Sequence, residues 1–188
     1  MVALTHPGYV VALVIHILSA MVAVGSVTIT DYFHILGLRN KVRERKFMFV
    51  YPYLSKMVIA STVLLIISGS TLIAFRPELL DNELFQFKMF LFVIVLINGL
   101  FLHRNVFPKM VACVEKKSAC NFELLFLSSL GGSISLVTWY AIMILAIIKS
   151  LGFLVSEFAV WYLLAFLLCF AIGFFIEKRM RHWTGISS

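Results

Sequence analysis

The sequence predicts an all-α integral membrane protein whose five helices cross the bilayer as a bundle, with the N-terminus outside and the C-terminus in the cytoplasm. Of its 188 residues, 62% are hydrophobic and 13% are charged, and the mean hydropathy is +1.01. A soluble domain cannot cover so much apolar surface with so few charges. The apolar residues also fall into long runs, each close to the roughly 20 residues that cross about 30 Å of hydrocarbon.

The five runs define the predicted spans, which lie at residues 9–29, 54–75, 89–107, 124–148 and 153–176. They form one transmembrane domain, residues 1–188, without a soluble domain. A membrane β-barrel would alternate apolar and polar residues, whereas these runs are continuously apolar, so helices must satisfy the backbone. The first run is too long, and too poor in preceding basic residues, for a cleaved signal peptide, so we expect it to remain as a helix.

The basic residues predict the orientation. Thirteen of the 16 Lys and Arg residues lie between spans one and two, after span three, after span five, or at the adjoining ends of spans two and three, which places these segments in the cytoplasm. Their nearest partners there are lipid headgroups, so we expect the bilayer as partner and no nucleic acid. The predicted location is the cell membrane, as a multi-pass protein, and specifically a prokaryotic inner membrane.

One stripe of the first span carries small and polar residues at three- and four-residue steps: His16, Ser19, Ala23, Ser26 and Thr30. His34 lies about five helical turns beyond His16 on the same stripe. Small residues let helices approach closely, so the stripe should face the bundle. Asp31 lies near the stripe at its cytoplasmic end, where we expect it to meet a basic residue or water.

His16 has two interpretations. An ionisable residue inside a membrane helix is by default a functional hypothesis, which makes His16 a candidate ligand of heme or metal, or a proton carrier. The alternative is a structural hydrogen bond between helices.

The third span carries a second set of polar residues. Asn98 lies deep enough to need a hydrogen-bonding partner, whereas His103 and Arg104 lie near the cytoplasmic interface. His103 is either a ligand or a hydrated side chain, and Arg104 can reach the interface without a special role.

The fourth span opens with serines and glycines, among them Gly131 and Gly132. We expect this face to pack tightly against a neighbouring helix, with a cofactor edge as the alternative occupant. Eight methionines suit Cu(I) in principle, but they are scattered along the chain. Cys113 and Cys120 lack the C-x-x-C spacing of a zinc or redox pair, so free thiols are expected.

Two segments resemble known families. The segment KMFLFVIVLINGLFLHRNVFPKM, which starts at Lys88, resembles the copper-resistance CopD-like membrane domains, and IHILSAMVAVGS resembles the helix of CopD-like and HemJ-like proteins in which a histidine precedes a glycine. The resemblance implies copper handling, or heme b and protoporphyrinogen oxidation. By this resemblance, His16 corresponds to the first-helix histidine of these families, and Lys88 and Arg104 correspond to their third-helix pattern. Asn98 departs from the HemJ-like pattern at mid-helix, which argues against the oxidase activity.

These observations favour a small membrane redox or metal-handling protein that holds heme b or copper through His16, helped by His103. From the span centres, the two histidines differ in depth by roughly 13 Å, which argues against both binding one heme. A second interpretation is a non-enzymatic anchor or assembly subunit in a homo-oligomer or a larger membrane complex. A third is a small transporter or proton path through Asp31, His34, Asn98 and His103. Whether the protein is an enzyme stays open.

Overall fold

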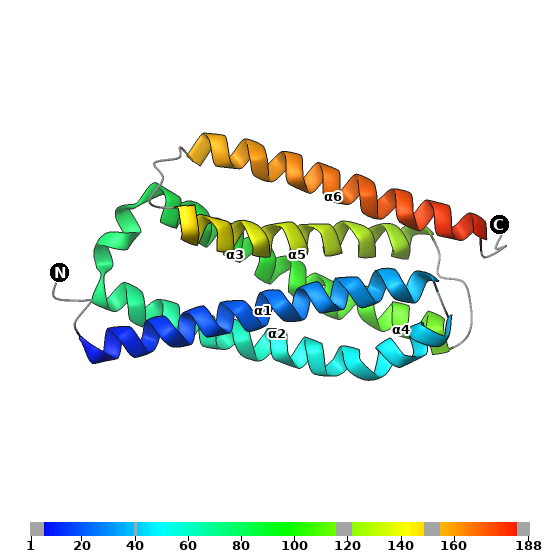
Figure 1. Cartoon of the computed structure of the whole chain (residues 1–188), viewed down its shortest axis with the longest axis horizontal. Helices are drawn as coiled ribbons and strands as arrows, with labels where there is room; N and C mark the ends of the chain where they lie inside the picture. The colour runs from blue at the N-terminus through cyan, green and yellow to red at the C-terminus, as the bar shows by residue number, and fades with distance from the viewer. Residues whose placement is uncertain (1–5, 40, 116–121, 149–154, 184–188) are drawn as a thin grey trace.

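The computed structural model describes residues 6–39, 41–115, 122–148 and 155–183, and this part of the chain is helical almost throughout. The helices are α1 (Pro7–Arg39), α2 (Lys41–Phe75), α3 (Glu83–Phe101), α4 (Phe107–Glu115), α5 (Phe122–Ile148) and α6 (Val155–Trp183). Two short segments complete the order, the 3₁₀ helix η2 (Pro77–Asp81) and the π-helix η3 (Leu102–Val106). The long helices run back and forth along one axis, and the chain starts and finishes at opposite ends of the molecule (Figure 1).

Five helical segments of the described chain are long and apolar enough to cross a membrane: Pro7–Tyr32, Val50–Phe75, Glu83–Ala112, Phe122–Ile147 and Val155–Ile176. The all-helical class and the predicted number of helices long and apolar enough to cross a membrane are therefore confirmed for this part of the chain. The largest difference lies at the third segment, which begins six residues before the predicted start because Asn82 caps it. The Asn82 Oδ1 atom accepts a hydrogen bond from the Phe85 backbone N–H at 3.0 Å.

The outer surface of the bundle is apolar, as expected for helices surrounded by lipid. Large hydrophobic side chains on several helices point outward, and α6 shows this most clearly, with Trp161 68% exposed and Leu168 63% exposed. In water this surface would drive aggregation. The outer surface therefore differs from that of a soluble bundle, while the interior holds buried serines and Thr138 beside apolar core clusters.

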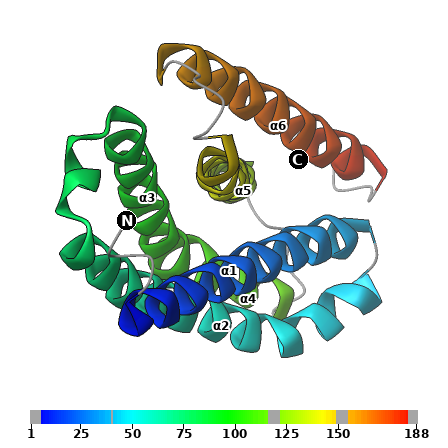
Figure 2. The same ribbon diagram turned by 60° about the vertical axis from the view of Figure 1, so that its left-hand side comes forward.

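Helix α5 runs through the middle of the bundle, with α1 and α2 on one side, α3 on another and α6 on a third (Figure 2). Hydrogen bonds join it to three neighbours. Tyr140 donates to Thr28 Oγ1 on α1 at 3.0 Å, because the Thr28 hydroxyl proton is already donated to the Val24 carbonyl. Asn98 on α3 donates to the Gly131 carbonyl at 2.8 Å, which confirms the expected partner for Asn98.

The third contact joins α5 to α6, where the Tyr162 hydroxyl lies 3.0 Å from Thr138 Oγ1. Thr138 is fully buried and donates its own proton to the Ile134 carbonyl one turn earlier. Threonine and serine hydroxyls in apolar helices commonly satisfy themselves in this way.

The third apolar segment changes its helical repeat near its C-terminal end. Pro108 has no N–H, so it cannot donate to the carbonyl of Arg104, and its ring crowds that carbonyl. Just before it, the Phe107 N–H bonds to Leu102 five residues back, which makes η3 a π-helix. A π-helical turn contains one residue more than an α-helical turn. The extra residue rotates the side chains of η3, including His103 and Arg104, relative to those of α3.

At the opposite end, η2 connects α2 to α3 outside the apolar segments. Arg76 Nε donates to Glu78 Oε1 at 2.8 Å. This hydrogen bond lowers the pKa of the exposed Glu78 carboxyl below its ordinary value.

Candidate functional site

A cavity of about 420 Å³ lies within the bundle and is lined by all six helices and by η3. Most of its wall is aliphatic or aromatic, with a few polar groups at set positions. Its polar and reactive lining residues are Thr30, Asp31, Tyr51, Ser55, Thr62, His103, Ser128, Ser129, Ser133, Ser135, Trp139 and Cys169. An apolar cavity with a small number of convergent polar groups is the usual form of a small-molecule site.

Asp31 is the acidic residue of this cavity. Its Oδ2 atom is buried and has no hydrogen-bond partner, and it is alone in this respect among the buried side-chain polar atoms of the described residues. No described side chain donates to this oxygen, and the expectation that Asp31 meets a basic residue or water stays a prediction. Thr30 and Asp31 both line the cavity, and the Asp31 carboxyl lies toward α5 at Gly132.

Glycine on α5 makes room for this carboxyl. A Cβ atom at Gly132 would lie 3.6 Å from Asp31 Oδ1, so the carboxyl rests against bare backbone. One residue earlier, Gly131 has a different function, because a Cβ there would lie 2.5 Å from Leu102 Cδ2. The predicted packing face thus divides in two: Gly131 permits close contact with η3, and Gly132 faces Asp31.

The serines of α5 complete the polar part of the cavity. Ser128 and Ser133 are both 6% exposed and lie within one helical turn of Gly132. Helix α6 approaches them closely through Gly173, since a Cβ there would lie 2.8 Å from Ser129 Oγ. These hydroxyls are neutral, so they can contact a bound cation or hydrogen-bond donor but cannot balance a charge.

His103 lines the same cavity from η3, and its Nδ1 atom lies 3.5 Å from Ser55 Oγ on α2. The side chain is also exposed on the outside of the bundle. The lining residues Ile59, Leu100 and Ile172 are likewise more than half exposed. The cavity therefore opens sideways between helices, on the apolar outer surface of the bundle.

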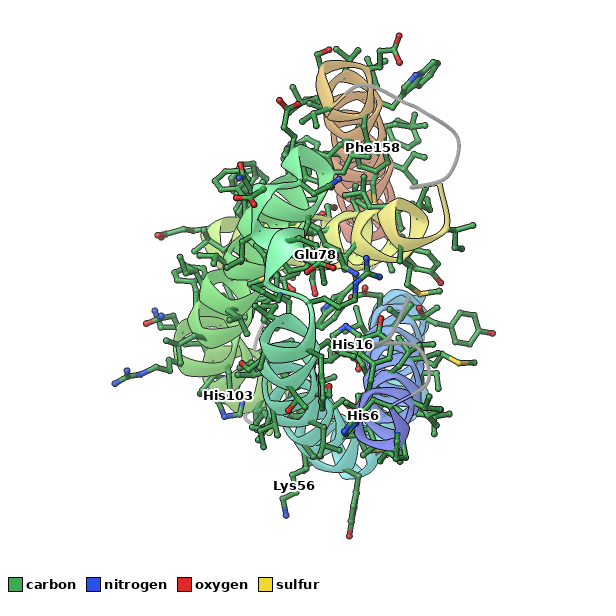
Figure 3. The ribbon with its side chains drawn as sticks, turned by 90° about the vertical axis from the view of Figure 1, so that its left-hand side faces the viewer. His6, His16, Lys56, Glu78, His103 and Phe158 are labelled. Carbon is green, nitrogen blue, oxygen red and sulfur yellow. The ribbon has the colours of Figure 1, made fainter. Side chains whose placement is uncertain are left out.

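His16 lies outside this cavity, between α1 and α2 (Figure 3). Its Nδ1 atom is 3.1 Å from Ser68 Oγ, and Ser68 donates its own proton to the Leu64 carbonyl at 2.6 Å, so His16 Nδ1 is the donor. Gly69 provides the space, because a Cβ there would lie 3.4 Å from His16 Cε1. The contact agrees with the structural interpretation of His16.

The two histidines are far apart. His16 contacts Ser68 and His103 contacts Ser55, thirteen residues apart on α2, which corresponds to about 20 Å along a helix. In Figure 3 His16 lies on the α1 side of α2 and His103 on the other side. Two axial ligands of one heme lie on either side of a single iron, so this pair cannot bind the same heme.

The other predicted residues are dispersed. Lys88, partly buried near the start of α3, lies within electrostatic range of His16. Asn98 is committed to its bond with Gly131, and Arg104 is exposed. His34 belongs to α1, but its side chain lies outside the described residues, as do the side chains of Cys113 and Cys120. Of the predicted residues whose side chains the structure describes, only Asp31 and His103 line the cavity.

Sequence reasoning did not predict Tyr51, Ser55 or Cys169 as site residues, although all three line the cavity. Tyr51 and Ser55 lie four residues apart around Pro52, a spacing that places both on one face of α2. That spacing was the available signal. The facing residues on α5 and α6 could not be paired with them without the packing of the helices.

Within the described part of the chain, no three His, Cys, Asp or Glu side chains are grouped as ligands of one metal ion. Comparison of the chain with protein-family models, with curated proteins and with solved structures gives no match in any of the three.

Proposed function

We propose that this protein is a multi-pass membrane protein that binds a small amphipathic cation in the cavity at Asp31, as a carrier or a binding subunit. The observation that carries the proposal is the buried Oδ2 atom of Asp31, which has no partner in a cavity of about 420 Å³. An isolated carboxylate in an apolar environment costs several kcal/mol unless a proton or a cation neutralises it. The cavity has room for a cation with an organic body.

The chemistry of the wall indicates the class of ligand. Among the described residues, no lysine or arginine side chain lines the cavity, so nothing there competes for the Asp31 carboxylate. Aromatic side chains of Tyr51, Phe107 and Trp139 form part of the wall, and aromatic faces attract organic cations. Aliphatic residues supply the rest. A bare metal ion would leave most of this apolar volume unfilled.

The proposed orientation is N-terminus outside and C-terminus in the cytoplasm, supported by thirteen of 16 basic residues on one side. Asp31 lies next to the last residue of the segment Pro7–Tyr32. In this orientation the carboxyl is near the cytoplasmic face, and the sideways opening of the cavity is toward the inner part of the bilayer.

A direct test is calorimetric titration of the purified protein in detergent with benzyltrimethylammonium, a permanently charged aromatic cation. We expect saturable binding by the wild type and its loss in Asp31→Asn, which keeps the shape of the side chain and removes the charge. Asp81→Asn is the matched control, because Asp81 is exposed at the end of η2, outside the cavity. Equal binding by wild type and Asp31→Asn would contradict the proposal.

Heme b or copper is a second candidate, favoured by the contacts of the two histidines. A serine of α2 lies beside Nδ1 of each imidazole, and a ligating histidine usually has one ring nitrogen hydrogen-bonded while the other binds the metal. His103, in the cavity wall, would hold heme b as a single axial ligand, which would supply electron transfer. The described donors around His16 fit copper poorly, since no second and third His, Cys, Asp or Glu are grouped with it.

Absorption spectra of oxidised and reduced protein, with metal analysis, test this candidate. If heme b binds at His103, the wild type has a Soret band, His103→Ala removes or shifts it, and His6→Ala leaves it unchanged. If His16 is the ligand, His16→Ala has that effect instead. Copper would appear in the metal analysis without a Soret band.

A further inference from the structure

The surroundings of Asp31 also indicate what neutralises its carboxyl when no cation is bound. Oδ2 is buried without a hydrogen-bond donor, and the polar lining residues nearest to it along α5 are neutral serines beside the bare backbone of Gly132. No described lysine or arginine lines the cavity. Among the described residues, therefore, no fixed positive charge is placed to balance an ionised Asp31.

With no described side chain to balance it, a buried carboxyl is neutralised by a proton or by a bound cation. In the empty cavity the available species is a proton, whereas in the loaded cavity it is the bound cation. A protonated carboxyl is neutral and offers a cation little attraction, so the two states exclude each other. We infer that a proton and an organic cation compete for the carboxyl of Asp31, so that each binding event releases one proton. This inference rests on the proposed function.

The exchange balances simply. The O–H bond of the Asp31 carboxylic acid breaks, its proton goes to water, and the bonding electron pair stays on the carboxylate, which then pairs with the cation. The net charge inside the cavity is unchanged, because one positive charge leaves as another enters. Such exchange is the elementary requirement of a carrier that couples the movement of a solute to that of protons.

Other titratable groups face the same cavity and must be distinguished from Asp31. They are Tyr51 from α2, His103 from η3 and Cys169 from α6, while the described residues that α5 contributes are not titratable. A cation that enters the cavity can also expel a proton from a protonated His103, since like charges repel. The test therefore needs a variant that lacks the imidazole.

The experiment measures proton release and affinity with benzyltrimethylammonium, which carries no proton of its own. Purified protein in weakly buffered detergent is titrated with the cation from about pH 5 to about pH 9, a range above the ordinary pKa of Asp. We expect close to one proton released per cation at the acidic end, and an affinity that rises by about tenfold per pH unit until it levels off. His103→Ala should retain both properties.

The outcomes separate the two proposals. If the cation binds in an Asp31-dependent manner, but with constant affinity and without proton release across the range, the competition is wrong while the cation site stands. If His103→Ala abolishes the release and retains binding, the proton comes from His103 and the inference is overturned. If the cation does not bind at all, the proposed function itself fails.

Discussion

Asp31 and Asn98 are both polar side chains on apolar helices, but their contacts differ. Asn98 is 9% exposed and donates to the Gly131 carbonyl at 2.8 Å, so its burial is compensated. Asp31 Oδ2 is buried without a partner. A fold tolerates an uncompensated polar group chiefly where a ligand or a proton completes its hydrogen bonding. Asn98 therefore has a structural function, whereas Asp31 points to binding.

The Asn98 contact predicts a loss of stability. Asn98→Ala should lower the free energy of unfolding by about 1 to 2 kcal/mol, because the amide donor disappears and the buried Gly131 carbonyl loses that bond. Thermal unfolding in detergent should show a lower midpoint. Asn105→Ala is the control, since Asn105 is exposed and bonds within its own helical segment, to the Phe101 carbonyl. Equal midpoints for the two variants would show that the α3–α5 bond contributes nothing.

The hydrogen bond of His16 to Ser68 predicts coupling between these two residues. Single substitutions to alanine at His16 and Ser68 should each destabilise the protein, and the double variant should lose less than the sum, by about 0.5 to 1.5 kcal/mol. Thermal midpoints of the four proteins give this coupling. Additive effects would mean that the 3.1 Å contact is energetically silent, which would strengthen a ligand-binding interpretation of the imidazole.

At the scale of elements, glycine sets how closely α5 approaches its neighbours. Leu102 is held in a buried cluster with Val106 and Leu124, so it has little freedom to move away from a side chain added at Gly131. Pro108 acts on the same region by imposing the π-helix that rotates η3. Together they fix the position of His103 relative to the cavity.

Gly131→Ala should therefore destabilise the protein by about 1 to 3 kcal/mol through overpacking. Gly25→Ala is the matched control on α1, because a Cβ there meets nothing within 4 Å and alanine favours the helix. Folded yield and thermal midpoint in detergent should fall for the first variant and stay level or rise for the second. An unchanged yield and thermal midpoint for Gly131→Ala would mean that Leu102 of η3 moves aside at little cost.

The sequence was sufficient to predict which elements form, but not how they face one another. The five apolar segments and the inward stripe of α1 follow from hydropathy and helical spacing, and Ser19, Ala23 and Ser26 are indeed buried. The cavity was not predictable in the same way, because its wall comes from six helices whose mutual rotation depends on packing. The rotation of α1 that brings both Thr30 and Asp31 to the cavity is part of that packing.

For the whole molecule, the charge asymmetry predicts a fixed topology. Single cysteines at Asn82 and Lys109, in a chain whose own three cysteines are replaced by serine, should react with an impermeant maleimide from opposite sides of the membrane. We expect Asn82 to be labelled from outside and Lys109 only after the cells are opened, because basic segments remain in the cytoplasm. Reversed labelling would contradict the orientation and the placement of Asp31 near the cytoplasmic face.

The central claim is that the Asp31 carboxylate selects a positive charge within an apolar cavity, and one pair of ligands tests it most directly. Benzyltrimethylammonium and neopentylbenzene have nearly the same shape, but only the first is charged. We expect wild-type protein in detergent, at about pH 8, to bind the cation at least about tenfold more tightly than the neutral hydrocarbon, and Asp31→Asn to lose this preference. A preference that is absent in the wild type, or that survives in Asp31→Asn, would contradict the claim.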